Sequence, residues 1–229
     1  MRSKMKGFFL VTLFLINSTF LFAQQRPDPN IPQGTNLEVP EGWHVRLDRP
    51  NEDIVIDSKP DSSDIYFVNM TPGWHVTTGP AGIFYHPANT ISGDYQVHTS
   101  IHFFNPEGRN REGYGIFFGG KNLDADNQQY VYFLLRNTGE YLIKTRSGDE
   151  TAVLQEWTAH DEIKTIKNGN ESSSVKNVLA VDVSGNTLSF TINGVDVATL
   201  NKDNLNTSGI FGLRVNHSVN IHVSDLGVK

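Results

Sequence analysis

The sequence contains no cysteine among its 229 residues. This absence excludes disulfide bonds, a thiol nucleophile, thiolate metal sites and a lipidated N-terminal cysteine. Long runs of basic residues are also missing, and the formal net charge is -6. Nucleic acid and anionic membranes recruit proteins through clustered Lys and Arg side chains, so neither is a partner that this sequence predicts.

Long apolar runs are absent too, except for one near the N-terminus. A basic start is followed by a mainly apolar stretch at residues 7–22 and by the small residue Ala23. The basic residues are Arg2, Lys4 and Lys6. This order is typical of a cleaved signal peptide over residues 1–23, with a retained membrane anchor as the alternative. We expect an exported protein, periplasmic or secreted, with no membrane span after cleavage, and the lack of disulfides fits a bacterial periplasm or the extracellular medium.

The sequence has no long amphipathic helical pattern and no internal repeat of fixed period; alternation with a period of two takes their place. Residues 177–202 are organised as three short strands joined by two tight turns. Apolar residues at Leu179, Val181 and Val183 alternate with Ala180 and Asp182 there, which predicts a strand buried on one face. The second turn is Asn193-Gly194, a pair suited to a type I′ hairpin because both residues tolerate positive φ.

The rest of the chain repeats this strand-and-turn pattern. Residues 94–104 form the longest alternating stretch, and residues 130–136 and 141–146 predict a further hairpin. Closely spaced strands with Gly and Pro turns indicate an all-β sandwich of two antiparallel sheets rather than a βαβ fold. We expect a linker or arm at residues 24–42 and one sandwich domain at residues 43–229.

Three segments carry a family resemblance. They are Gly113-Tyr-Gly-Ile-Phe-Phe-Gly with Tyr130-Val-Tyr-Phe-Leu-Leu-Arg-Asn-Thr-Gly-Glu-Tyr, residues 177–197, and Gly209-Ile-Phe-Gly-Leu-Arg-Val with Val219-Asn-Ile-His-Val-Ser-Asp-Leu-Gly-Val. Together they resemble the concanavalin A-like jelly roll of lectins and glucanases, in its laminin G-like and 3-keto-disaccharide hydrolase variants. The resemblance implies a jelly-roll β-sandwich that hosts lectins, carbohydrate-binding modules, hydrolases, lyases and adhesive domains, so it implies a fold more than an activity.

The acidic motif of one hydrolase type is missing. Laminarinase-type hydrolases of this fold carry Glu-x-Asp-x-x-Glu on one strand, and no such run occurs here. The acid-rich stretches at residues 48–57, 124–126 and 149–150 have the composition of turns and loops. Residues from distant segments could still form an acid pair in the folded protein, so the sequence does not decide whether the protein is an enzyme.

Histidines and oxygen-bearing side chains suggest two kinds of site. His98 and His102 share one strand face but lie about 13 Å apart, too far to bind one metal together, so each is a candidate sugar donor or general base, or a polar residue of a half-exposed face. Asn122, Asp124 and Asp126 place side-chain oxygens at alternate positions, which suits calcium, although the EF-hand pattern is absent and a plain polar turn is the alternative.

Aromatic and basic residues form the more suggestive set. The candidates on the strands after His98 and His102 are Tyr130, Tyr132, Arg136, Lys144, Arg214 and His217. If their faces coincide with that of the two histidines, they form a concave patch of rings and donors for a sugar, and the Lys and Arg side chains favour an acidic or sulfated one. Half-buried tyrosines and solvated charges are the alternative.

Three hypotheses follow. The first is an exported carbohydrate-binding module with Tyr130 and Tyr132 as stacking platforms and Arg136, Arg214 and the two histidines as hydrogen-bond donors. The second is a glycoside hydrolase of the 3-keto-disaccharide hydrolase type, as the resemblance implies. The third is a structural or adhesion module that binds a protein partner. No cofactor is predicted with certainty; calcium is the one candidate.

Overall fold

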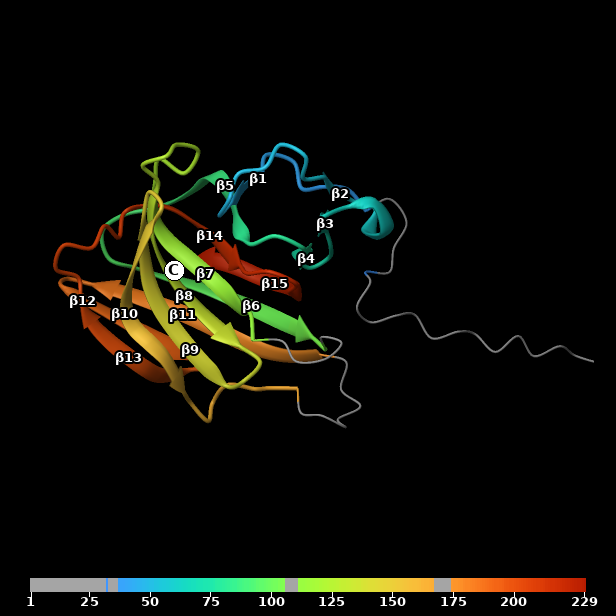
Figure 1. Ribbon diagram of the computed structural model, residues 1–229. Helices are drawn as coiled ribbons and strands as arrows, with labels where there is room; N and C mark the ends of the chain where they lie inside the picture. Colours follow the sequence, from blue (N-terminus) through green and yellow to red (C-terminus); the bar gives the residue numbers. More distant parts are fainter. Residues whose placement is uncertain (1–31, 33–36, 106–110, 167–173) are drawn as a thin grey trace, which may run out of the picture.

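The computed structural model describes residue 32 and residues 37–105, 111–166 and 174–229. Two β-sheets are packed face to face in these residues (Figure 1). Sheet A has seven strands in the order β1 (His44–Leu47), β5 (Gly82–Ile91), β14 (Gly209–Val215), β7 (Gly113–Lys121), β8 (Gln129–Arg136), β9 (Glu140–Ser147) and β10 (Glu150–Ala159).

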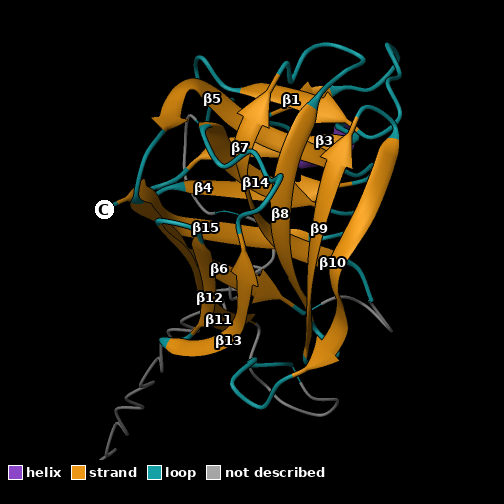
Figure 2. Cartoon of the chain, turned by 90° about the vertical axis from the view of Figure 1, so that its left-hand side faces the viewer, coloured by secondary structure: helices purple, strands orange, loops and turns teal. Residues whose placement is uncertain are grey.

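Sheet B has eight strands and contains both the longest strand and the C-terminal one. Its order is β13 (Val195–Asn201), β12 (Thr187–Ile192), β11 (Ser174–Ser184), β6 (Tyr95–Phe104), β15 (Asn220–Val228), β4 (Trp74–Thr78), β3 (Ile65–Asn69) and β2 (Ile56–Asp57). A short 3-10 turn at Pro60–Ser62 precedes β3. Figure 2 shows the neighbouring strands β7, β8, β9 and β10 of sheet A facing the viewer.

The main core lies between the two sheets. Alternate residues of β8, such as Phe133, meet residues of sheet B, such as Phe190, and these two rings contact edge to face at 5.3 Å. The inward residues of β6 include Val97, Ile101 and Phe103, as the alternation predicts. Successive side chains point to opposite faces of a strand, so the residues between these form the outer surfaces of the sandwich.

The predicted fold class is confirmed: the structure is an all-β sandwich with jelly-roll architecture. The prediction of wholly antiparallel sheets is correct except at β2, which pairs with β3 in parallel. The Asn193-Gly194 turn is confirmed, because both residues have positive φ, at 52° and 86°. β10 was not predicted; register shifts after Val153 and Gln155 interrupt the alternation by which a strand is recognised.

The N-terminal predictions fall largely on undescribed residues. The signal peptide expected at residues 1–23 lies outside the described residues, and of the arm expected at residues 24–42 only residue 32 and residues 37–42 are described. The backbone carbonyl of Glu38 accepts a hydrogen bond from Asn69 at 2.9 Å, so this end of the arm lies against β3. Among the residues that the structure describes, no helix is long and apolar enough to cross a bilayer.

Candidate functional site

The outer face of sheet A carries a second apolar cluster, separate from the core between the sheets. Tyr130, Tyr132 and Leu134 of β8 point outward, because Val131 and Phe133 point into the main core. The outward residues pack with Leu123 of the loop between β7 and β8 and with residues from the other strands of sheet A: Ile83, Tyr85, Phe117 and Leu142. The outer face of sheet A is therefore a platform of buried, mutually packed side chains rather than a solvated surface.

An ion pair on the outer side of this platform joins the end of β14 to the residue that follows β1. Arg214 of β14 lies across from Gly115 on β7 and Ile83 on β5. Its two terminal nitrogens donate to the two carboxylate oxygens of Asp48, just after β1, at 2.6 and 2.5 Å. The Arg214 guanidinium also lies 5.6 Å from the centre of the Tyr132 ring. A bidentate, charge-assisted pair of this kind holds both side chains in one orientation.

Arg146 of β9 is the third charged member of the cluster. Its Nε donates to the carbonyl oxygen of Gly148 at 2.7 Å, which fixes the plane of the guanidinium. Its terminal nitrogens make longer contacts, 3.4 Å to Asp48 Oδ1 and 3.5 Å to Asp149 Oδ1. The Arg146 side chain is only 9% exposed, whereas that of Asp149 is fully exposed. Arg146 is thus nearly buried but weakly paired.

The charges of this cluster alter its acid–base properties. Burial raises the pKa of Asp48, but the hydrogen bonds and charge of Arg214, followed by Arg146 and His217, outweigh burial and hold that pKa below its usual value. Burial raises the pKa of Tyr132 to about 12, although the charge of Arg214 opposes the shift. At neutral pH the cluster therefore presents an ionised carboxylate, two guanidinium groups and neutral phenols.

A pocket of about 970 Å³ opens beside this cluster. Its polar lining is Asp48, Arg49, Asn51, Arg146, Asp149 and His217, and its apolar lining includes Leu47, Ile54 and Pro80. This volume lies in the range of small-molecule binding sites. Fixed donors and acceptors beside apolar walls suit a ligand with many hydroxyl groups, which both donates and accepts hydrogen bonds.

The structure brings part of the predicted set to this place. Arg214, Tyr130 and Tyr132 lie in the cluster, and His217 lines the pocket. Lys144 is opposite Tyr132 on the neighbouring strand and shares its face.

Arg136 lies at a different point of sheet A. It donates to Glu140 at 2.8 Å, and its guanidinium sits 4.2 Å from the centre of the Trp157 ring. The strongest partners of Arg136 are thus other residues of the protein.

The two tyrosines lie on the predicted face but are nearly buried. Tyr130 is 3% exposed and Tyr132 6% exposed, and each packs among the outward residues of sheet A. Little of either ring remains for direct stacking against a sugar. Their structural role is to support the Asp48, Arg214 and Arg146 cluster from below.

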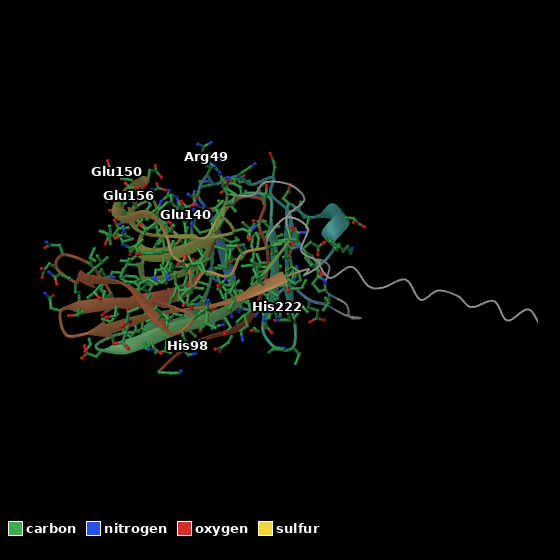
Figure 3. All side chains as sticks on the ribbon, turned by 90° about the horizontal axis from the view of Figure 1, so that it is seen from below. Arg49, His98, Glu140, Glu150, Glu156 and His222 are labelled. Carbon is green, nitrogen blue, oxygen red and sulfur yellow. The ribbon has the colours of Figure 1, made fainter. Side chains whose placement is uncertain are left out.

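The expectation that His98 and His102 share a surface with the tyrosines is wrong. Both histidines belong to β6 in sheet B, and their neighbours Val97 and Ile101 point into the main core. They therefore lie on the outer face of sheet B, opposite the pocket. Figure 3 shows His98 and His222 on one side of the sandwich and Arg49 on the other. Alternation predicts which side of a strand a residue occupies, but it does not predict to which sheet the strand belongs.

Three histidines lie in a row on this opposite face. His222 of β15 pairs in register with His102 of β6 on one side and with His75 of β4 on the other. Burial and the charge of His222 lower the pKa of His75 to about 4, and burial also lowers the pKa values of His102 and His222. Farther along the same face, His98 contacts Asp225 at 3.1 Å. The described residues contain no cluster of three His, Asp or Glu side chains with metal-binding geometry.

The loop predicted for calcium folds over the edge of sheet A. Asp124 accepts a hydrogen bond from the Tyr85 hydroxyl, and its backbone carbonyl accepts one from Arg46 at 3.0 Å. Asp126 lies 3.9 Å from Arg46, and Asn122 adopts a left-handed turn with φ of 52°. A calcium ion here would compete with Arg46 for the Asp124 carbonyl and the Asp126 carboxylate, and calcium binding by this loop stays a prediction.

Sequence reasoning missed Asp48 as a site residue. Asp48 begins a polar stretch at residues 48–51 that has the composition of a turn. Its partner Arg214 is 166 residues away, so no local pattern links them. An acid placed directly after a strand was the one available signal, and it is a weak one.

Comparison with known proteins identifies the fold. It is the concanavalin A-like jelly roll. The carbohydrate-binding module CBM66 from Bacillus subtilis superposes with a TM-score of 0.57 at 13% identity, over 86% of this chain and 99% of that one. The GH16 protein of the Bacteroides ovatus mixed linkage glucan PUL, in complex with its G4G4G3G product, gives 0.52 at 11% identity, over 85% of this chain and 97% of that one.

The exoplasmic/lumenal domain of VIP36, in its Ca²⁺/Man-bound form, also superposes, with a TM-score of 0.52 at 12% identity over 82% of each chain. No protein-family model and no curated protein matches the sequence. At these identities the superpositions establish the fold and leave the function to be argued from the site.

Proposed function

We propose that this protein binds carbohydrate in the pocket beside Asp48 and Arg146, where the turns after β1, β4, β9 and β14 meet at one end of sheet A. The observation that carries the proposal is the fixed cluster of Asp48, Arg214 and Arg146 beside a pocket of about 970 Å³. The Asp48 carboxylate accepts hydrogen bonds from sugar hydroxyls, and the Arg146 guanidinium donates to hydroxyl oxygens. Because the protein already holds both groups in place, binding costs little side-chain entropy.

The solved structures of the same fold support this choice. CBM66 is a carbohydrate-binding module, the VIP36 domain was solved with mannose, and the GH16 protein with a glucan product. The predicted signal peptide agrees with a protein that meets glycans outside the cytoplasm. Export, to the periplasm or the medium, is part of the proposal.

Hydrolysis is less well supported by the same site. Glycoside hydrolysis requires one carboxylic acid that donates a proton and a second carboxylate at a defined separation. The Asp48 carboxyl has a lowered pKa, so it is ionised at neutral pH and acts as an acceptor rather than as a proton donor. Asp149 is fully exposed, where water competes for any proton transfer.

Binding to a set of immobilised glycans tests the proposal. We expect selective binding by the wild-type protein and binding about tenfold weaker, or worse, for Arg146→Gln, because a hydrogen bond from a charged donor is lost. Lys176→Gln is the matched control: it also removes one positive charge, but from β11 of sheet B, next to His102. Wild-type protein that binds no glycan, or equal losses in both variants, would refute the proposal.

A further inference from the structure

The charges around the pocket are not balanced. Asp48 is the one carboxylate set into the cluster, and each of its oxygens already accepts a hydrogen bond from Arg214, which neutralises its charge. Arg146 then remains with contacts of 3.4 and 3.5 Å, at the outer limit of hydrogen bonding. Asp149, its other partner, is fully exposed, and an ion pair of that kind contributes little.

Arg146 is also poorly placed to satisfy its donors with water. Its side chain is only 9% exposed, and the bond from Nε to Gly148 fixes the guanidinium plane. Burying a guanidinium costs free energy unless its N–H groups donate to an acceptor, and an anionic acceptor offsets the most. Its two terminal nitrogens form a fork that matches the two oxygens of a carboxylate or sulfate.

Further positive charge surrounds this fork. Arg49 lines the pocket, and Lys144 lies one alternation from Arg146 on the outer face of β9. The charges that act on the nearby Tyr130 hydroxyl are those of Arg214, Arg146 and Arg46 against the single carboxylate of Asp48. At the Tyr130 hydroxyl positive charges thus outnumber negative ones, although the whole chain carries a net charge of -6. In the pocket the exposed Asp149 offsets part of this excess.

We infer that the pocket selects an anionic sugar, with Arg146 binding the carboxylate of a uronic acid or the sulfate of a sulfated residue. This inference rests on the proposed function and narrows its ligand class. Arg146 is the specificity-determining residue, and Arg214 keeps the Asp48 carboxylate neutralised so that the anion is not repelled. Arg49 and Lys144 add longer-range attraction.

Matched acidic and neutral polymers test the inference. Polygalacturonate and alginate are compared with their carboxyl-reduced forms, and a carrageenan with its desulfated form, by titration calorimetry at low and at physiological salt. We expect binding about 10- to 100-fold tighter to the acidic member of at least one pair, weakening as salt rises, because charged hydrogen bonds are worth about 1.5–3 kcal/mol. The pair that shows the preference distinguishes carboxylate from sulfate.

Two variants assign the preference to the fork. Arg146→Gln should lose most of the preference and keep only the weak, salt-sensitive part that Arg49 and Lys144 contribute. Arg146→Lys should keep more of the preference, since it retains the charge but not the fork. Lys176→Gln should behave as wild type. Equal binding of both members of every pair, with glycan binding intact, overturns the inference and leaves the proposed function standing. Binding to no polymer and to no immobilised glycan overturns both.

Discussion

Arg214 and Asp48 form a two-pronged ion pair across 166 residues of sequence, with nitrogen–oxygen distances of 2.6 and 2.5 Å. The pair ties the turn after β1 to the middle of sheet A. It also leaves the neighbouring Arg146 weakly paired, because Arg214 already neutralises the charge of Asp48.

Removing the carboxylate of the pair should destabilise the protein. In Asp48→Asn the guanidinium of Arg214, which is 6% exposed, loses its anionic partner. We expect a loss of about 3 kcal/mol in the free energy of unfolding, since breaking a buried pair leaves an uncompensated charge. Urea unfolding measures the change. Asp149→Asn, which removes an exposed carboxylate from the same cluster, should cause no measurable change; equal effects would contradict the account.

The buried histidine on sheet B should make the protein less stable in mild acid. The pKa of His75 is about 4 in the folded protein, against about 6.5 when unfolded. The unfolded chain therefore takes up the proton first, and stability falls as pH decreases from about 6.5 to about 4. The shift corresponds to about 3 kcal/mol. His102 and His222, whose pKa values are also lowered, should add to the loss in the same direction.

Unfolding at a series of pH values measures this dependence. His75→Gln should flatten the curve between pH 6.5 and 4. Asp48 acts in a lower window: its folded pKa is below the usual value, so its contribution is lost only as the pH falls below about 4. A wild-type curve without a slope above pH 4 would show that His75 is not held neutral by burial.

Glycan binding should not depend on the histidines of β6. In the double variant His98→Gln, His102→Gln both changes lie on the outer face of sheet B, away from the pocket. We expect an affinity within about twofold of that of the wild type, because substitutions far from a site and without shared partners act independently of it. Surface plasmon resonance with any glycan that the wild type binds provides the measurement. A loss of affinity comparable with that of Arg146→Gln would instead place the binding site on sheet B.

Two glycines should respond differently to alanine. Gly194 has φ of 86°, and a Cβ there would meet no atom within 4 Å, so Gly194→Ala should cost about 1 kcal/mol through backbone strain. At Gly115 a Cβ would lie 2.1 Å from the carbonyl oxygen of Phe133 in the adjacent strand. Gly115→Ala should therefore force β7 and β8 apart and cost about 3 kcal/mol or more.

Thermal and urea unfolding of both variants test this order. Gly194→Ala should also keep the glycan affinity of wild type, because the turn lies in sheet B. Gly115→Ala lies across from Arg214 and should weaken binding even where the protein folds. Equal destabilisation by the two changes would contradict the close approach of the backbones at β7.

Alternation in the sequence predicts the faces of single strands well. The inward residues of β6 and β8 and the turn at Asn193-Gly194 agree with the structure, because each depends on local geometry. β10 escaped prediction because its register shifts break the alternation. The site was harder to predict for a different reason: it is assembled from Asp48 of the turn after β1, Arg146 of β9 and Arg214 of β14. Which strands share a sheet is a property of the whole fold.

The same limit explains the outcome for the candidate residues. Arg214, His217 and the two tyrosines lie at or beneath the pocket, whereas His98 and His102 lie on the opposite face. Composition predicts rings and donors correctly, but burial depends on the neighbours that fold over them. The tyrosines pack with residues of other strands, such as Phe117 of β7 and Ile83 of β5, and no local pattern reveals which strands are neighbours.

Mapping of a bound glycan by NMR tests the central claim most directly. Backbone amide shifts of isotope-labelled protein are recorded while a glycan found by array binding is added. We expect the largest shift changes at Asp48, Arg49, Arg146 and His217, which line the pocket, and no changes in β6 and β15. Shift changes centred on the histidines of sheet B, with those four residues unaffected, would contradict it.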